Sequence, residues 1–317
     1  MKAAAISLIL LVALSLGCTG NDAGTPGDES EAILGFAVSP LSYSESDFTS
    51  FLEDAGEAVL WAGDWAELNT SAATIAAIST SYGLVPVIEV QFFEQDRGVL
   101  IRPLNSSTRQ LYMQLAAGFA EAYKPEYLGL GIEVDILYER SSTDFEAFVR
   151  LFYETYDEVK AVSPGTKVFT VFQLERLMGL KGGLYGGEND PEQSKWFLID
   201  AFPKADLVAF TTYPSLIYRY PSEIPSDHYS QIASHTDKPV IFTEVGWHVG
   251  QIPGWESDES EQAEFISRFF NLTRSLEPEL AIWSFMYDQD VQQPFNTMGL
   301  RNSDGSPREG WAAWSAG

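Results

Sequence analysis

Cysteine and histidine are scarce in this sequence. Its 317 residues include one cysteine, Cys18, and three histidines, which are His228, His235 and His248. A lone cysteine cannot close a disulfide within the chain or build a Cys-based zinc site. The histidines are scattered along the chain without a metal-ligand spacing, so we expect neither a metal nor a cofactor.

Positive charge is also scarce. Nineteen Lys and Arg residues stand against 45 Asp and Glu residues, which gives a formal net charge of −26. So acidic a chain would repel nucleic acid and anionic lipid head groups, and we exclude both as partners. Neutral ligands such as sugars are compatible with this surface. We expect a monomer.

The longest apolar run is too short to span a bilayer. It extends from Ala3 to Leu16, about 14 residues, which is the length of the apolar part of a signal peptide. It ends in LSLGC at 14–18, which resembles a lipobox, although Ser15 and Leu16 are not the residues usual at these positions. We therefore interpret residues 1–18 as a signal peptide and Cys18 as a lipidation site that would anchor the exported protein to a membrane. The alternative is an ordinary secretory signal.

Residues 19–30 (TGNDAGTPGDES) contain no apolar pattern that could fold. Their Gly, Pro, Asp and Ser content is typical of a flexible tether. The remaining residues, 31–317, are enough for one large domain, and 45% of the whole chain is hydrophobic.

From residue 31 onward, short apolar runs alternate with longer amphipathic runs, which is typical of βαβ units and a parallel sheet. Eight strands are expected: Ile33–Ser39, Ala58–Gly63, Leu84–Val90, Tyr127–Val134, Lys167–Phe172, Leu207–Thr212, Pro239–Glu244 and Leu280–Met286. Eight helices are expected between and after them: Ser46–Gly56, Thr70–Ser81, Ser106–Tyr123, Thr143–Val162, Asp190–Ala201, Pro225–Ser234, Ser257–Ser275 and Glu309–Ser315. This alternation predicts a single α/β domain, the (β/α)₈ TIM barrel. A doubly wound open sheet is the alternative, but no Gly-rich phosphate-binding fingerprint follows the first strand.

Carboxylates follow two of the expected strands. The fourth strand leads into Gly131-Ile132-Glu133, and the seventh ends in TEVGW at 243–247. Active-site residues of a barrel lie at the carboxyl ends of its strands. A carboxylate at the end of an apolar run costs stability unless it is paired or useful. Glu133 and Glu244 are therefore the candidate catalytic residues.

These two strands, together with Met298–Gly305 (MGLRNSDG) after the eighth, resemble the clan of (β/α)₈ retaining glycoside hydrolases that includes cellulases, β-mannanases and endo-β-galactanases. The resemblance covers most of residues 31–314. It implies that Glu133 is the acid/base and Glu244 the nucleophile. The sequence departs from the clan at Ile132, where an Asn that binds the sugar 2-hydroxyl is usual, and it shows no Arg at the end of the second strand.

The chemistry can be stated without the resemblance. Two carboxylates about 5 Å apart can cleave a glycosidic bond by double displacement with retention of configuration. Proximity and partial burial should raise the pKa of Glu133, and a hydrogen bond from Tyr213 or a backbone N–H should keep Glu244 ionised. The sequence therefore predicts a retaining glycoside hydrolase that acts on a β-linked poly- or oligosaccharide.

Other polar and aromatic residues at strand ends are candidates for substrate binding, because aromatic faces stack on sugar rings. These candidates are Tyr213, Trp283, Trp247, Trp61, Asp64, Gln173 and Asp288. Two alternatives remain open. One is a non-catalytic carbohydrate-binding lipoprotein on a degenerate barrel, which Ile132 favours. The other is a solute-binding lipoprotein of a transporter, which would have two lobes joined by a hinge.

Overall fold

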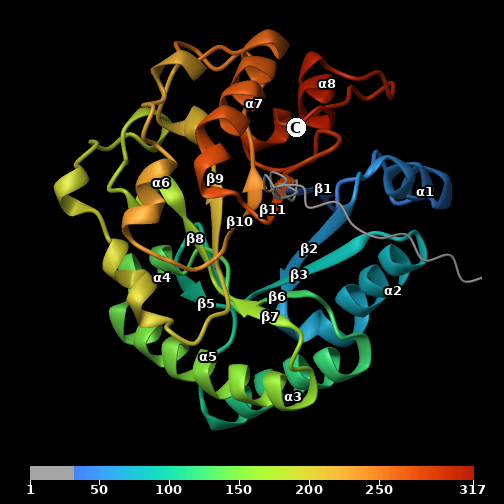
Figure 1. Cartoon of the computed structure of the whole chain (residues 1–317), viewed down its shortest axis with the longest axis vertical. Helices are drawn as coiled ribbons and strands as arrows, with labels where there is room; N and C mark the ends of the chain where they lie inside the picture. The colour runs from blue at the N-terminus through green and yellow to red at the C-terminus, as the bar shows by residue number, and fades with distance from the viewer. Residues whose placement is uncertain (1–31) are drawn as a thin grey trace, which may run out of the picture. The chain divides into compact units, whose positions relative to one another are not determined.

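Parallel strands surround a common axis in the computed structural model, which describes residues 32–317 (Figure 1). The sheet order is β7-β6-β3-β2-β1-β11-β10-β9-β8. β7 and β8, at the two ends of this order, are consecutive segments separated by Thr170 alone, so the sheet closes on itself. The strands are β1 (Ile33–Ala37), β2 (Ala58–Asp64), β3 (Val85–Gln91), β6 (Tyr127–Gly129), β7 (Lys167–Phe169), β8 (Val171–Gln173), β9 (Val208–Thr212), β10 (Val240–Val245) and β11 (Leu280–Trp283).

Alternate side chains of each strand fill the barrel and face the helices outside it, as the two-residue period of a strand requires. The interior cluster includes Leu60, Val87, Phe169 and Ile282. A larger apolar cluster lies between the outer face of the strands and the helices. The predicted TIM barrel is confirmed, and each of the eight predicted strands overlaps a strand of the barrel.

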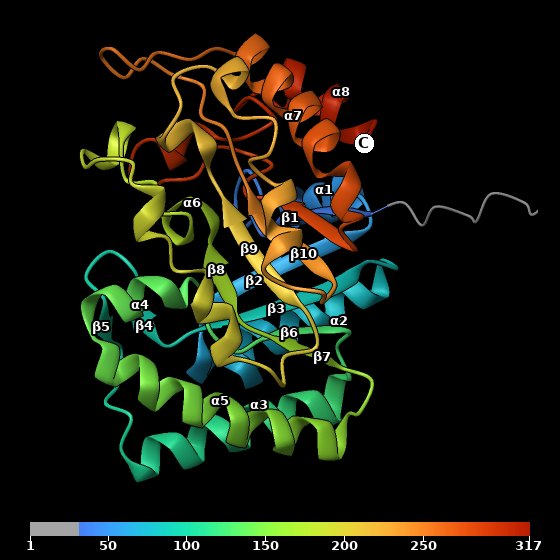
Figure 2. The same cartoon turned by 60° about the vertical axis from the view of Figure 1, so that its left-hand side comes forward.

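Helices cover the outside of the barrel, with α3 beside α5 and α7 beside α8 (Figures 1 and 2). They are α1 (Glu45–Asp54), α2 (Ala73–Ser81), α3 (Ser106–Tyr123), α4 (Val134–Arg140), α5 (Ser142–Val162), α6 (Leu174–Leu177), α7 (Glu259–Thr273) and α8 (Glu309–Ser315). A π-helical turn, Leu68–Ala72, leads into α2, and a small antiparallel hairpin of β4 (Phe93–Glu94) and β5 (Val99–Leu100) follows β3.

Two of the predicted helices were wrong. Residues 190–201 form separate 3₁₀ turns at Pro191–Gln193 and Trp196–Ala201, and the segment predicted as Pro225–Ser234 has a 3₁₀ turn at Ser230–Ser234. Trp196, Phe197, Leu198 and Ile199 are consecutive, and four consecutive apolar residues cannot all lie on one stripe of a helix. The barrel is therefore covered by loops, rather than by long helices, after β8 and β9.

The strand predicted as Tyr127–Val134 is also shorter than expected, because β6 ends at Gly129. The chain then turns within four residues, and the unpredicted helix α4 begins at Val134. This early turn determines where Glu133 lies.

The predicted signal peptide, the lipidation of Cys18 and the tether lie outside the described residues. Within residues 32–317, no helix is both long enough and apolar enough to cross a membrane.

Gly35 tests how closely β1 and β2 approach each other. A Cβ at this position would overlap the carbonyl oxygen of Ala58 on β2. We expect Gly35→Ala to destabilise the barrel by about 3 kcal/mol in urea unfolding, since neither backbone can move without disturbing the sheet. Gly118→Ala is the matched control. Nothing lies within 4 Å of a Cβ there, in the middle of α3, so this change should stabilise by about 0.5–1 kcal/mol. Equal effects of the two changes would contradict the tight β1–β2 packing.

Candidate active site

Glu133 occupies an unusual backbone conformation at the mouth of the barrel. Its φ and ψ are 52° and 47°, in the left-handed region that residues with a side chain seldom adopt. It directly precedes α4, and its carbonyl oxygen accepts a hydrogen bond from the Ile136 N–H at 2.9 Å. Its carboxylate accepts a hydrogen bond from the Thr211 hydroxyl at 2.6 Å. Strained conformations of this kind concentrate at functional sites.

Glu244 is directed into the barrel by an irregularity of β10. Ile241 faces the interior, so regular alternation would place Thr243 and Val245 inside and Glu244 outside. The pairing register shifts between Phe242 and Glu244, and Val245 then packs in the outer cluster. A bulge of this kind re-aims a side chain. It brings the Glu244 carboxylate to the mouth of the barrel.

Tyr213 follows β9 and donates a hydrogen bond from its hydroxyl to the Glu244 carboxylate. The same hydroxyl lies 3.0 Å from the hydroxyl of Ser284, which in turn donates to the Val245 carbonyl oxygen at 3.1 Å. The hydrogen bond from Tyr213 that the sequence predicted is therefore present.

Thr211 of β9 lies beside both glutamates. Its hydroxyl donates to the Glu133 carboxylate, and its backbone is in register with that of Glu244 on β10. Both glutamates are partly exposed, whereas Thr211 and Tyr213 are buried around them. The two carboxyl groups are thus more accessible than the side chains that hold them.

The two carboxyl groups influence each other. Burial and the charge of Glu244 raise the pKa of Glu133 to about 8, against the effect of the Thr211 hydroxyl. Burial also raises the pKa of Glu244, and the Tyr213 hydroxyl opposes this increase. At neutral pH the Glu133 carboxyl therefore holds its proton.

A cavity of about 940 Å³ begins at Glu244 and Ser284 and extends past β1 and β2 to α1 and α2. Its wall is mainly apolar and aromatic, with four polar side chains on the side of α2 and the preceding turn. The apolar residues include Tyr43, Phe48, Trp61, Ile75, Ile78 and Phe285, and the polar ones are Glu67, Thr70, Ser71 and Thr74. This cavity adjoins Glu244 and could hold a ligand of a few sugar units.

Of the predicted substrate-binding residues, Tyr213 and Trp61 lie at the site or in the wall of this cavity. Asp64 lies at the end of β2, where its two oxygens accept hydrogen bonds from Arg102 at 2.7 and 2.8 Å. Arg102 follows β5 in the chain, so the structure supplies from elsewhere an arginine that the sequence does not show at the end of β2.

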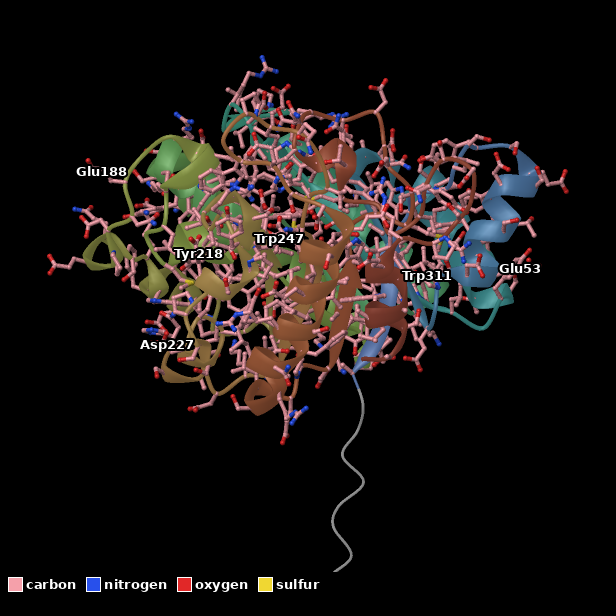
Figure 3. The ribbon with its side chains drawn as sticks, turned by 90° about the horizontal axis from the view of Figure 1, so that it is seen from above. Glu53, Glu188, Tyr218, Asp227, Trp247 and Trp311 are labelled. Carbon is pink, nitrogen blue, oxygen red and sulfur yellow. The ribbon has the colours of Figure 1, made fainter. Side chains whose placement is uncertain are left out.

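Trp247 and Trp283 are not at the site, so the expectation that they face substrate was wrong. Both are fully buried on the outer side of the barrel. Trp247 stacks on Phe265 of α7 at a ring distance of 5.0 Å, and Figure 3 shows it within the mass of side chains. Trp283 packs against Trp314 of α8 at 5.4 Å. Their indole N–H groups donate inside the protein, to Ser257 and to the Met298 carbonyl oxygen.

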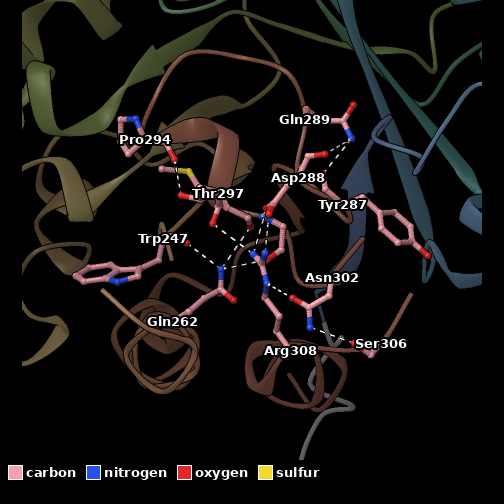
Figure 4. Close-up of polar contacts among 12 residues, drawn as sticks. Trp247, Gln262, Tyr287, Asp288, Gln289, Pro294, Thr297, Asn302, Ser306 and Arg308 are labelled. Carbon is pink, nitrogen blue, oxygen red and sulfur yellow. Dashed lines mark hydrogen bonds and ion pairs between the residues drawn. The ribbon is translucent and has the colours of Figure 1, made fainter. Parts of the chain in front are cut away.

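Asp288 and Gln173 are also engaged in structure, in contrast to the expectation that they bind substrate. Asp288 pairs with Arg308 at 2.6 Å and accepts from the Gly299 N–H at 2.9 Å, which fixes the loop after β11 (Figure 4). Gln173 caps α6 by accepting from the Arg176 N–H at 2.7 Å, and it donates to Glu175 at 2.5 Å. Both side chains thus hold loops in place.

Sequence reasoning did not assign Glu175 a role, although it follows the fifth strand. Its buried carboxylate accepts from the Thr212 hydroxyl at 2.6 Å and from the Tyr213 N–H at 3.2 Å, and His228 Nε2 lies 3.3 Å away. It therefore fixes the backbone of Tyr213, whose hydroxyl reaches Glu244.

A cluster of ion pairs surrounds Glu139, on the helix that begins directly after Glu133. Glu139 of α4 contacts Arg176, Lys181 and Lys195 at 2.6, 2.7 and 2.8 Å. Although burial alone would raise the pKa of Glu139, the three cations hold it at about 2. This ion cluster ties α4, and with it Glu133, to the loop that follows β8.

No group of three or more His, Cys, Asp or Glu side chains within residues 32–317 is arranged to hold a metal ion. The arrangement instead presents two carboxyl groups with different hydrogen-bond partners at the mouth of a closed barrel.

No protein-family model matches the sequence, and no curated protein matches it. Solved structures do match the fold. A family 39 glycoside hydrolase from the gut symbiont Bacteroides cellulosilyticus WH2 aligns with a TM-score of 0.64 at 16% identity, over 90% of this chain and 63% of that one. The exo-β-1,4-mannosidase Op5Man5 from Opitutaceae bacterium strain TAV5 aligns at 0.65 and 13%, over 92% and 62%. This chain thus spans less than two thirds of both of these proteins.

Xylanase 10B from Thermotoga maritima is matched over nearly its full length. Its TM-score is 0.63 at 10% identity, over 91% of this chain and 95% of that one. These neighbours are all (β/α)₈ glycoside hydrolases, and this chain shares their fold.

Proposed function

We propose that the protein is a retaining glycoside hydrolase acting on a β-linked poly- or oligosaccharide, with Glu244 as nucleophile and Glu133 as acid/base. The observation that carries the proposal is the presence of two carboxyl groups at the mouth of the barrel, each held by a side chain at the end of β9: Glu133 accepts from the Thr211 hydroxyl and Glu244 from the Tyr213 hydroxyl. The fold neighbours give it further support, since those named above include a xylanase and an exo-β-1,4-mannosidase.

In the first step, a carboxylate oxygen of Glu244 attacks the anomeric carbon and the bond to the leaving oxygen breaks. Glu133 gives its proton to that oxygen, so the leaving group departs as an alcohol. In the second step, Glu133 takes a proton from water while the water oxygen attacks the anomeric carbon. The ester to Glu244 breaks, and both carboxyl groups return to their starting states.

The protonation states support these roles. A pKa of about 8 lets Glu133 carry the proton that a general acid needs at neutral pH. The hydroxyl of Tyr213 donates to Glu244 and favours the ionised form that a nucleophile needs.

The sugar ring under attack would lie over Glu244, and sugars on its non-leaving side would extend into the cavity. Tyr43 and Phe285 line this cavity, and aromatic side chains of this kind can stack on sugar rings. The leaving group would lie on the side of Glu133.

A non-catalytic carbohydrate-binding protein is the second candidate, and Ile132 favours it. This side chain is buried and cannot bond a sugar hydroxyl. A solute-binding protein with two lobes is no longer a candidate, because residues 32–317 form one barrel.

Incubation with a panel of β-linked glycans tests the proposal. We expect release of reducing ends from at least one β-1,4-linked glycan, and proton NMR should show the β-anomer as the first product. Binding of a glycan without any cleavage would favour the second candidate. An α-anomer as first product would exclude the double displacement.

Tyr213→Phe tests the environment of the nucleophile. Loss of the hydroxyl removes a hydrogen bond to a charged group, so we expect kcat/KM to fall about 10- to 100-fold. The pKa of Glu244 should rise. Because the nucleophile must be ionised, the acidic limb of the pH profile should move to higher pH. The control is Tyr229→Phe, which removes another buried hydroxyl, one that lies 3.2 Å from Thr212. An unchanged acidic limb in Tyr213→Phe would contradict this role of Tyr213.

A further inference from the structure

Glu89 is a third carboxyl group at the candidate active site, and none of the steps above uses it. It lies near the end of β3, in register with Ala62 on β2 and Gly129 on β6. Its side chain is fully buried. Neither of its oxygens has a hydrogen-bond partner among the described residues, which is unusual for a buried carboxyl group.

Shape holds this side chain in place. Val87, two residues earlier on β3, fills the barrel interior, so the alternation of the strand directs Glu89 inward as well. A Cβ on Gly129 would lie 2.9 Å from the Glu89 Cγ and 2.9 Å from the ring of Phe169. The glycine therefore leaves the space in which the stem of Glu89 packs, directly above the apolar filling of the barrel.

The groups that face Glu89 include the two proposed catalytic residues. Burial raises the pKa of Glu89 well above its usual range. The charge of Glu244, and to a smaller extent that of Glu133, act in the same direction. The nearby hydroxyl of Thr243, which does not reach hydrogen-bonding geometry with Glu89, opposes them. Ala62, Gly129 and Phe169 contribute no charge from β2, β6 and β7. Within residues 32–317, no Lys, Arg or His forms an ion pair with Glu89, so the group is a neutral acid that carries an O–H donor.

We propose that Glu89 is a positioning residue: a carboxylic acid that stays protonated beneath the site, whose O–H dipole stabilises the ionised form of Glu244. The inference deepens the proposed function, since it takes Glu244 as the nucleophile. Tyr213 then supports the nucleophile by a direct hydrogen bond, and Glu89 supports it from the barrel interior.

The charge balance of the double displacement explains why a neutral group is needed there. Before the reaction, Glu244 is ionised and Glu133 is protonated. In the glycosyl-enzyme, Glu244 is an ester and Glu133, having given up its proton, is ionised. The pair carries one negative charge in both states. An ionised Glu89 would add a second charge in a poorly solvated space and would favour protonation of the nucleophile.

Two variants separate the neutral donor from other roles. Glu89→Gln keeps the shape and a neutral donor, whereas Glu89→Met keeps the approximate length and removes the donor. In infrared difference spectra at pH 7, wild type minus Glu89→Gln should show the carbonyl stretch of a protonated carboxyl group. The control is Glu139→Gln, which should show the loss of carboxylate bands only, because the pKa of Glu139 is about 2.

The second measurement is the titration of the Glu244 carboxyl group, followed by NMR of side chains labelled with ¹³C. We expect the pKa of Glu244 to be the same in Glu89→Gln as in wild type and to be higher in Glu89→Met. A carboxylate band for Glu89 at pH 7, or a lower pKa of Glu244 in Glu89→Gln, would show that Glu89 is ionised and overturn the proposal. If the pKa of Glu244 were unchanged in a folded Glu89→Met variant, Glu89 would serve only to fill space, and the proposal would be wrong.

Both measurements are made on the protein without substrate. They therefore test Glu89 even if no glycan is cleaved, and a failed search for activity would not count against it. If activity is found, the acidic limb of the pH profile should move to higher pH in Glu89→Met and stay in place in Glu89→Gln.

Discussion

Glu244→Gln should lower the rate of glycan hydrolysis by at least about 10³-fold, because an amide is a far weaker nucleophile than a carboxylate and no neighbouring group can replace it. Thr211 and Tyr213 remain in place, so substrate binding should be close to that of wild type. Reducing-sugar assays and calorimetric binding measured on the same preparation separate these two effects. Equal activity of wild type and Glu244→Gln would remove the enzyme hypothesis.

Glu244→Gly gives a sharper form of the same test. Without the nucleophile, azide can enter from the vacated side and attack the anomeric carbon of an activated β-glycoside in one step, and the leaving group departs. The product should be the α-glycosyl azide. In Glu133→Ala, by contrast, Glu244 still forms the glycosyl-enzyme and azide then displaces Glu244, so the product should be the β-glycosyl azide. If the two products were exchanged, so would be the roles of Glu133 and Glu244.

Glu133→Gln should abolish most activity on glycans but much less on glycosides with a good leaving group. Protonation of the leaving oxygen matters little when that oxygen leaves readily as an anion, so the loss should be about 10²- to 10⁴-fold for glycans and far smaller in the first step with dinitrophenyl glycosides. Pre-steady-state release of dinitrophenol measures that step. A loss of equal size on both kinds of substrate would contradict the general-acid role.

The pH profile should change in the same variant. In wild type, activity should fall as pH rises through about 8, where Glu133 loses the proton it must donate. With dinitrophenyl glycosides, this basic limb should be absent from the first step in Glu133→Gln.

The variant that loses activity, Glu133→Gln, should gain thermal stability. The pKa of Glu133 is about 8 in the folded protein against 4.5 for an ordinary Glu, so the folded state binds the proton more tightly than the unfolded chain. The stability that this proton provides is complete below pH 4.5 and is lost as pH rises to about 8. Glu133→Gln should therefore raise the Tm by a few degrees at pH 8–9 and by less at pH 5. A lower Tm at pH 9 would contradict the costly burial of Glu133.

The sequence was sufficient to predict the barrel because the alternation of short and long apolar patterns is a property of the whole chain. It also located the two glutamates, since a carboxylate at the end of an apolar strand is conspicuous. It could not show how Glu244 comes to face the interior of the barrel. The bulge before Glu244 turns that residue inward and Val245 outward, and no residue type signals it. Trp283 was assigned to the wrong face, although Leu280 and Ile282 of the same strand fill the interior and regular alternation places Trp283 outside.

The sequence also could not show which residues from distant parts of the chain contact the site residues. Arg102 reaches Asp64 across 38 residues, and Thr211 reaches Glu133 across 78. Glu89, on the third strand, was not among the candidates from the sequence. Its isolation depends on Gly129 and Phe169, which come close only when the barrel is closed.

The ion cluster around Glu139 has a consequence for redesign. Lys181 and Lys195 belong to the loops that stand in place of a long helix after β8. Both form ion pairs with Glu139 of α4, the helix that begins next to Glu133. The ion pairs thus link these loops to the helix that carries Glu133 at its start. A loop grafted here to change binding on the leaving-group side would need two cations in the positions of Lys181 and Lys195. Without them, Glu139 would lose two ion pairs, and α4 would no longer hold Glu133 in line with Glu244.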